Sequence, residues 1–178
     1  MQGNGLKWGV VDKSGVEFGP TFQDMSEASA NEVIFYRSIF RHGIDEKRRV
    51  QIPSKWRPSQ PNVEFTLIPW PNGALPDACL LVLPPAEMLA LAAKIKQMPS
   101  ADPKAQSLRR LIGGQSASAE LDKGGRICLP EEMARRAAIG KEAVLVGLVD
   151  RFEIWSPERY DAVSAVDAAL LPEAFKLI

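Results

Sequence analysis

The 178-residue sequence contains one histidine, two cysteines and no apolar run of about 20 residues. The missing apolar run excludes a transmembrane helix, and a metal site needs three or four ligands that so few His and Cys residues do not supply. Basic and acidic residues balance at 22 each, so the chain lacks the net charge of histones and basic arms. Its 46% apolar fraction predicts a folded core of one domain or two small ones.

The few candidates for chemistry have simple structural interpretations. His42 is expected to be a strand residue near a turn, and Cys79 and Cys128 lie in apolar runs where buried, reduced cysteines are expected. No nucleophile has a base to pair with, so we predict neither an enzyme nor a cofactor. The first residues are acidic and contain no long apolar stretch, which predicts no secretory signal and a cytoplasmic location.

Charge is unevenly distributed along the chain. Residues 41–57 carry six basic and two acidic groups, and residues 94–110 carry five basic and one acidic group. The zero total therefore conceals two basic segments in an otherwise acidic chain. Such local concentration is what a protein needs to bind a polyanion, although a solvated charged turn gives the same pattern.

Two segments, Ile44–Pro53 and Leu121–Pro130, repeat each other without a gap. Both contain an apolar residue, Asp, three residues, Arg, three residues and Pro. Each is flanked by strand-like stretches and followed by a short helical signal, then by a strand that enters a proline. Each unit thus predicts strand, tight turn, strand, short helix, strand and helix.

One such unit buries too little surface to be stable alone, so the two are expected to share a core. The prediction is a mainly β, α+β fold, a double swapped-hairpin barrel with internal pseudo-two-fold symmetry and short helices. The expected segments are an N-terminal extension (1–34), repeat one (39–88), a helix and linker (89–115), repeat two (116–159) and a C-terminal helix (160–178).

Local signals place the turns and helices. Gly124 and Gly125 suit a tight turn that requires positive φ, whereas Lys47 and Arg48 take those positions in the first copy. Helical spacing covers residues 86–97, a second helix over 108–112 is expected to end at Gly113-Gly114, and the last helix begins after an N-cap at Ser156.

The doubled Asp-x-x-x-Arg-x-x-x-Pro turn, the strand Cys79–Pro84 and the run Arg151–Pro157 resemble the MraZ family of bacterial transcriptional regulators. That family has two tandem SpoVT/AbrB-type domains, and the resemblance covers about residues 35–160. It implies an AbrB-like fold and a cytoplasmic, nucleoid-associated regulator of the division and cell-wall gene cluster. It also implies a ring-like homo-oligomer that binds double-stranded DNA at direct repeats in the promoter.

Two features depart from the family pattern. Arg48 stands where the first copy usually has glycine, and an extension of about 34 residues precedes the first repeat. The glycine and acidic content of the extension suggests an arm or a short extra hairpin.

The resemblance maps the DNA-binding motif onto Asp45–Arg49 and Asp122–Arg126. A guanidinium can bond guanine O6 and N7 in the major groove, so Arg49 or Arg48 is expected to read a base edge. The expected phosphate contacts are Lys47, Arg41, Lys55 and Arg57, and Arg126 is the motif arginine of the second copy. Asp45 and Asp122 are expected to accept turn amides together with Gly124 and Gly125. Each Asp–Arg pair could instead be an ion pair that braces its hairpin.

Two other functions remain open from the sequence. The fold could serve as an oligomeric protein-interaction scaffold whose DNA-binding face has drifted, or as an antitoxin-like partner of a toxin. A promoter fragment that the protein retards in a salt-sensitive manner would distinguish the regulator from the scaffold, whereas an antitoxin would need a neighbouring toxin gene and a long toxin-binding tail.

Overall fold

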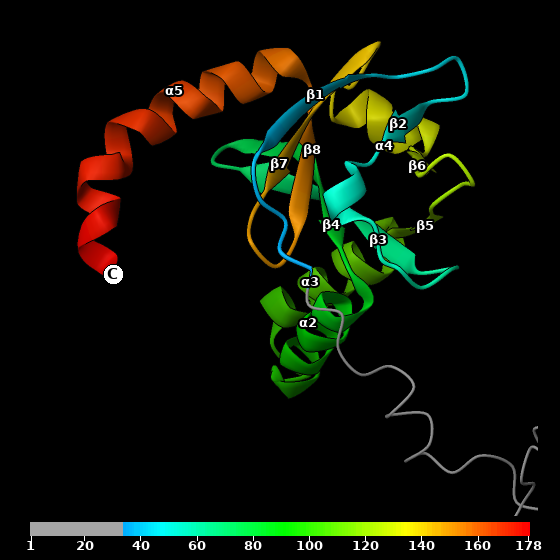
Figure 1. The fold of residues 1–178 in the computed structure, drawn as a ribbon. Coiled ribbons are helices and arrows are strands. Elements are labelled where there is room, and N and C mark those ends of the chain that lie inside the picture. Colours follow the sequence, from blue (N-terminus) through cyan, green and yellow to red (C-terminus); the bar gives the residue numbers. More distant parts are fainter. Residues whose placement is uncertain (1–33) are drawn as a thin grey trace, which may run out of the picture. The chain divides into compact units, whose positions relative to one another are not determined.

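A six-stranded sheet joins the two repeats (Figure 1). The computed structural model describes residues 34–178, and the predictions for residues 1–33 lie outside the described residues. In chain order the elements are β1 (Ile39–Gly43), β2 (Arg49–Gln51), η1 (Ser54–Trp56), β3 (Glu64–Asn72), β4 (Leu75–Leu83), α2 (Pro85–Gln97), α3 (Pro103–Gln115), β5 (Ala117–Glu120), β6 (Arg126–Cys128), α4 (Glu131–Arg136), β7 (Glu142–Gly147), β8 (Phe152–Trp155), α5 (Pro157–Ala174) and η2 (Phe175–Leu177).

The strand order β1-β7-β8-β4-β3-β5 is symmetric about its centre. Exchanging each strand with its counterpart in the other repeat (β1 with β5, β3 with β7, β4 with β8) gives the same order reversed. All neighbours are antiparallel, and the first strand of each repeat pairs with a strand of the other repeat, β1 with β7 and β5 with β3. The predicted swapped hairpins and pseudo-two-fold symmetry are therefore confirmed.

The second strands of the two repeats pair with each other and not with the six-stranded sheet. β2 and β6 form a separate two-stranded ladder in which Val50 lies opposite Ile127 and Arg49 opposite Cys128. Val50 and Ile127 are fully buried, because alternation sends these two side chains into the core. The pairing places the two turns that precede β2 and β6 side by side.

The main core lies between the sheet and the β2–β6 pair with its short helices. Its centre is aromatic: Trp56 of η1 contacts Phe152 of β8 at a ring-centroid distance of 5.2 Å, and Phe65 of β3 contacts Phe152 at 5.9 Å. All three side chains are buried. Both repeats contribute to this core, so neither is complete without the other.

Helices cover the opposite face of the sheet. Ile68, Leu81 and Leu83 of β3 and β4 pack with α2 and α3, while Cys79 and Trp155 pack with the first turns of α5. Since both faces of β4 are covered, all residues from Ala78 to Leu83 are buried. This explains the uninterrupted apolar run that marked this strand in the sequence.

The structure confirms two helix predictions, corrects a third and corrects the expected burial of one cysteine. The helix over 86–97 is α2, and Ser156 caps α5 by accepting a hydrogen bond from the Arg159 amide. Gly113-Gly114 does not end the second helix, because α3 begins after the cap at Asp102 and continues through both glycines to Gln115. Cys79 is buried as predicted, but Cys128 is exposed, because it follows Ile127 on β6 and alternation turns it outward.

Two glycines give a matched test of the packing. A methyl group on Gly147 would lie 2.4 Å from the Tyr36 carbonyl oxygen, whereas one on Gly113 would meet nothing within 4 Å. The Tyr36 oxygen accepts a hydrogen bond from the Val149 amide at 2.9 Å, so it is not free to move. Gly147→Ala should lower the free energy of unfolding by about 1–3 kcal/mol, and Gly113→Ala should raise it by about 0.5–1 kcal/mol. Urea denaturation measures both, and equal effects would contradict the packing described here.

Candidate nucleic-acid interface

The two Asp-x-x-x-Arg turns form the connections that lead into β2 and β6. In each turn the Asp carboxylate closes the loop on the backbone. Asp45 Oδ1 accepts hydrogen bonds from the Lys47 and Arg49 amides, both at 2.9 Å. Asp122 Oδ1 accepts the equivalent bonds from the Gly124 and Arg126 amides at 2.8 and 3.0 Å. The prediction that both aspartates are turn acceptors agrees with this geometry.

In each turn, the residue just before the arginine adopts the left-handed backbone conformation, with a positive φ. In the second copy Gly125 has φ 73°, and in the first copy Arg48 takes φ 58°. Only glycine adopts such a φ without strain, so the arginine at position 48 stays in an unfavourable backbone conformation. Gly125 also allows close packing, because its Cβ would lie 2.4 Å from the Arg57 guanidinium carbon.

The two motif arginines and the two aspartates form one ring of four charges. Arg49 donates from Nε to Asp45 Oδ2 at 2.8 Å, and Arg126 donates from Nε to Asp122 Oδ2 at 2.9 Å. Each arginine also faces the aspartate of the other repeat: the Nη1 atoms of Arg49 and Arg126 lie 3.4 and 3.6 Å from that Oδ2. The bracing ion pair is thus present in both copies, and it crosses between them.

This ring changes the acidity of its carboxyl groups. The hydrogen bond from the Arg126 side chain, with those from the backbone amides, lowers the pKa of Asp122 to about 2. The hydrogen bond from the Arg49 side chain likewise holds the pKa of Asp45 below its ordinary value. Both aspartates therefore stay ionised and paired at any physiological pH.

The cations at the tips of the turns are directed to solvent. Lys47 and Lys123 are exposed, and 45% of the Arg48 side chain is exposed against 29% for Arg49. The Arg48 side chain donates a long hydrogen bond to the Leu129 carbonyl, at 3.4 Å, and forms an ion pair with Glu131 at 3.5 Å. Of the two arginines proposed to read a base, Arg48 therefore has the more exposed and more weakly bonded side chain.

The other predicted phosphate contacts lie on two sides of β1: Arg41 is on the side of α5, and Lys55 and Arg57 are on the side of β2. Arg41 on β1 is exposed and pairs with Asp161 of α5. Arg57 donates from Nε to the Ile52 carbonyl at 2.8 Å, and with exposed Lys55 it lines a cavity of about 650 Å³ next to β2. His42 of β1 lies in the same cavity wall, which agrees with its prediction as a strand residue.

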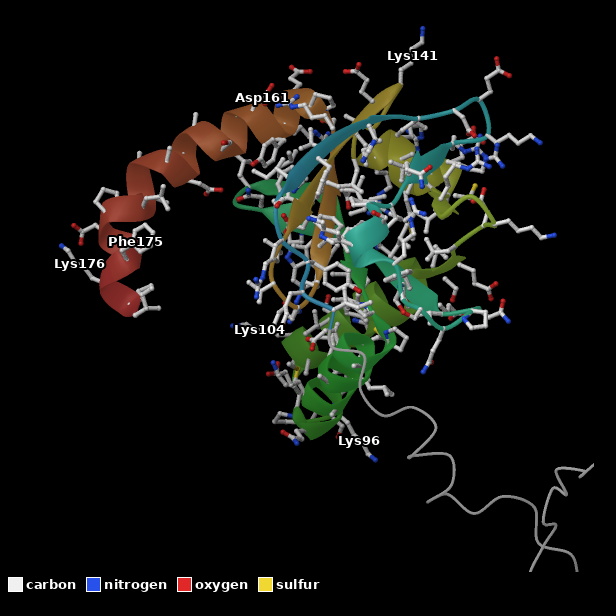
Figure 2. All side chains as sticks on the ribbon, viewed as in Figure 1. Lys96, Lys104, Lys141, Asp161, Phe175 and Lys176 are labelled. Atoms are coloured by element: carbon white, nitrogen blue, oxygen red, sulfur yellow. The ribbon has the colours of Figure 1, made fainter. Side chains whose placement is uncertain are left out.

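Sequence reasoning missed two lysines near the turns. Lys123 sits directly after Asp122, outside the repeated motif positions. Lys141 lies next to the first turn, since its carbonyl oxygen accepts the Ile44 amide at 2.8 Å, and its side chain projects from the molecule in Figure 2. Only the β1–β7 pairing brings Lys141 there, so no local sequence signal could have found it.

The second basic segment does not join this surface. Arg109 of α3 donates to the Ile95 and Met98 carbonyl oxygens at 3.0 and 2.8 Å, and so closes the end of α2. Within residues 34–178 no group of three or more His, Cys, Asp or Glu side chains could hold a metal ion. Nor is any helix of this part of the chain long and apolar enough to cross a membrane.

A swapped-hairpin barrel with paired Asp–Arg turns defines an AbrB-like protein, and comparison with known proteins agrees. The family described as "MraZ protein, putative antitoxin-like" matches residues 114–174. The Transcriptional regulator MraZ of Hydrogenovibrio crunogenus is 34% identical over 131 residues, which is 73% of this chain and 85% of that protein. The protein of the same name from Natranaerobius thermophilus is 37% identical over 122 residues, 68% of this chain and 81% of that protein.

The chain belongs to the MraZ family. Both of these relatives carry the name of a transcriptional regulator.

The charge ring makes stability depend on acid pH. The pKa of Asp122 is lower in the folded protein than its ordinary value of 3.8, so its stabilising effect is present above about pH 4 and is lost as the pH falls towards 2. Asn at 45 and 122 still accepts the turn amides but cannot ionise. The Asp45→Asn/Asp122→Asn variant should therefore be less stable at pH 6 and lose less stability between pH 4 and 2 than the wild type. Urea denaturation across this range tests the prediction, and parallel curves for the two proteins would contradict it.

The backbone strain at Arg48 predicts opposite effects for two turn substitutions. Arg48→Gly relieves an unfavourable left-handed φ and should raise the free energy of unfolding by about 0.5–1 kcal/mol. Gly125→Ala introduces that strain and a clash with Arg57, and should lower it by about 1–3 kcal/mol. Thermal or urea denaturation gives both values, and a destabilised Arg48→Gly variant would show that the arginine side chain itself holds the turn.

Proposed function

We propose that this protein is a transcriptional regulator that binds double-stranded DNA through its two Asp–Arg turns. Its target would be promoter direct repeats of the bacterial division and cell-wall gene cluster, bound by a ring-like homo-oligomer in the cytoplasm, on the nucleoid. The observation that carries the proposal is the pairing of β2 with β6, which presents two turns and their exposed cations on one surface. A ribbon of two antiparallel strands has the width of the major groove.

The ring of ion pairs sets which groups are free for DNA. Asp45 and Asp122 would repel phosphates if they were unpaired, but Arg49 and Arg126 neutralise them. The tips then carry the unneutralised positive charge of Lys47 and Lys123. With the exposed Glu46 included, residues 45–49 and 122–126 carry five basic and three acidic groups, so the turns are basic although the whole chain has no net charge.

The geometry favours a division of roles among the predicted contacts. Arg48 is the base reader, because its planar guanidinium is half exposed and weakly held. Lys47 and Lys123 neutralise phosphates on either side of it. Arg49 and Arg126 hold the turns in shape and lie behind the tips, with about a third of each side chain exposed.

The remaining cations would extend the contact along the DNA backbone. Lys55 and Arg57 would reach a phosphate from the cavity beside β2, and Arg41 would contact only DNA that extends to the α5 side of β1, where it now pairs with Asp161. One subunit neutralises only a few phosphates, so its affinity is low at physiological salt. Several subunits on adjacent repeats raise the affinity through effective concentration, and for this reason the oligomer belongs to the mechanism.

A gel shift with a promoter fragment that carries the direct repeats tests the proposal. Lys47→Ala/Arg48→Gly should weaken binding at least about tenfold and reduce the slope of log affinity against log salt by about 1 for each lost phosphate contact. The loss cannot come from unfolding if Arg48→Gly leaves the turn as stable as predicted above.

Arg135→Ala is the matched control, since Arg135 is an exposed arginine of α4 that pairs with Glu132. It should bind like the wild type. A wild-type protein that does not retard the fragment, or a double variant that retards it equally at every salt concentration, would overturn the proposal and favour the protein-interaction scaffold.

A further inference from the structure

The cavity beside β2 is lined by three cations that have no carboxylate partner in the described chain. They are Arg37, Lys55 and Arg57, and none of the described residues that line the cavity is an aspartate or glutamate. No ion pair within residues 34–178 involves any of the three. Like charges around one cavity repel each other, so an anion bound among them is favoured.

His42 adds a buried polar atom without a partner to the same cavity wall. Its Nε2 atom is shielded from solvent and makes no hydrogen bond within the described residues, although the ring lines the cavity. A buried nitrogen left unpaired costs stability, and the few such atoms in a native protein each need an explanation. A ligand that supplies the missing hydrogen bond is one.

Other walls of the cavity are aromatic. Phe35 is 50% exposed, and the Arg37 guanidinium carbon lies 4.7 Å from its ring centroid. Phe40 meets Trp56 edge to face at a centroid distance of 5.2 Å. Such rings favour a planar partner, and the volume of about 650 Å³ is that of a site for a small organic molecule.

The backbone that carries part of this wall is strained. Ser38 lines the cavity and has φ 81°, a left-handed conformation that is unfavourable for any residue but glycine. It is held there from both sides, because its carbonyl oxygen accepts the Gly147 amide at 3.1 Å and Tyr36 pairs with Val149. Strain that the surrounding structure maintains in this way is concentrated at ligand-binding sites.

We propose that this cavity binds a nucleoside diphosphate. Arg37, Lys55 and Arg57 would neutralise the diphosphate through charge-assisted hydrogen bonds to its oxygens. The base would stack on the exposed ring of Phe35, as bases do on aromatic side chains in other proteins. A small rotation of the His42 ring would bring Nε2 to a hydrogen-bonding group of the ligand. The inference does not rest on the proposed function, since no step of it needs DNA.

The same phosphate chemistry could come from DNA, because Lys55 and Arg57 are also proposed to contact its backbone. A duplex keeps its bases paired and stacked, so it offers phosphates to the two cations but no free ring to Phe35. A free nucleotide satisfies the cations and the aromatic wall together. It would also compete with DNA for Lys55 and Arg57.

The lone histidine gives a direct test of the site. His42 is the only histidine of the chain, so its ring signals are unique in the proton NMR spectrum of the untagged full-length protein. Titration with ADP, GDP, CDP and UDP should move these signals for at least one nucleotide, with a dissociation constant of about 1–100 μM by calorimetry. The corresponding nucleoside and inorganic pyrophosphate should each bind at least about tenfold more weakly. Failure of all these nucleotides to bind, or binding that leaves the His42 signals unchanged, would overturn the inference.

A pair of charge-reversal variants tests the cations. Arg37→Glu/Lys55→Glu alters exposed side chains of the cavity and should weaken nucleotide binding at least about tenfold. Lys104→Glu/Arg110→Glu is the matched control, since both residues are exposed on α3 and do not line the cavity, and Lys104 projects outward in Figure 2. It should bind like the wild type. Equal losses in the two variants would show a nonspecific effect of charge and contradict the site.

His42→Phe separates a binding role from a structural one. The substitution keeps a planar ring and removes the unpaired nitrogen, so the melting temperature should stay the same or rise, while nucleotide affinity falls at least about fivefold. A lower melting temperature with unchanged affinity would show that His42 serves the fold and would overturn its place in the site.

A comparison with DNA distinguishes the two sources of phosphate. If a promoter duplex moves the His42 signals and no nucleotide does, the cavity serves the DNA backbone and this inference is overturned while the proposed function stands. If a nucleotide binds as described and the protein does not retard the promoter fragment, the proposed function fails and this inference stands.

Discussion

The crossed contact between the two Asp–Arg turns is the interaction on which the rest of this structure depends. Each aspartate closes its own turn through two backbone amides, and each arginine reaches carboxylates of both repeats. Four charges that would be unfavourable in isolation are satisfied together at the surface. Because β2 and β6 form their ladder with each other and not with the six-stranded sheet, this ring and a short ladder fix the relative position of the two turns.

The same ring organises the charge of the molecule. It leaves the exposed Lys47 and Lys123 at the tips, beside the strained Arg48 that pairs with Glu131, so a chain of zero net charge presents basic turns. The symmetry that builds the ring is broken elsewhere. Repeat one has a covered helix in α2 and a basic α3, whereas repeat two ends in an uncovered acidic α5.

Much of the fold follows from the repeated motif and its flanking patterns. The tight turns, the helix over 86–97 and the N-cap at Ser156 were all predictable, because each depends on a few neighbouring residues. The prediction that Gly113-Gly114 ends a helix was wrong: contacts of Leu108 and Ile112 with the sheet stabilise α3 more than two glycines destabilise it. Cys128 was misplaced because a three-residue strand gives too little alternation to show which face is buried.

Some features of the candidate site were likewise predictable from the sequence, and others were not. The sequence by itself determined that two equivalent Asp–Arg turns exist, that they share a barrel and that basic residues gather around the first, since these properties are written in a local repeat. Only the tertiary structure decided that Arg49 and Arg126 bind carboxylates of both repeats, that Arg48 and Lys123 face solvent and that Lys141 joins the turn. These outcomes depend on strand pairings between residues 73 or more positions apart, and the spacing of residues along a chain does not reveal which distant charges will neutralise one another.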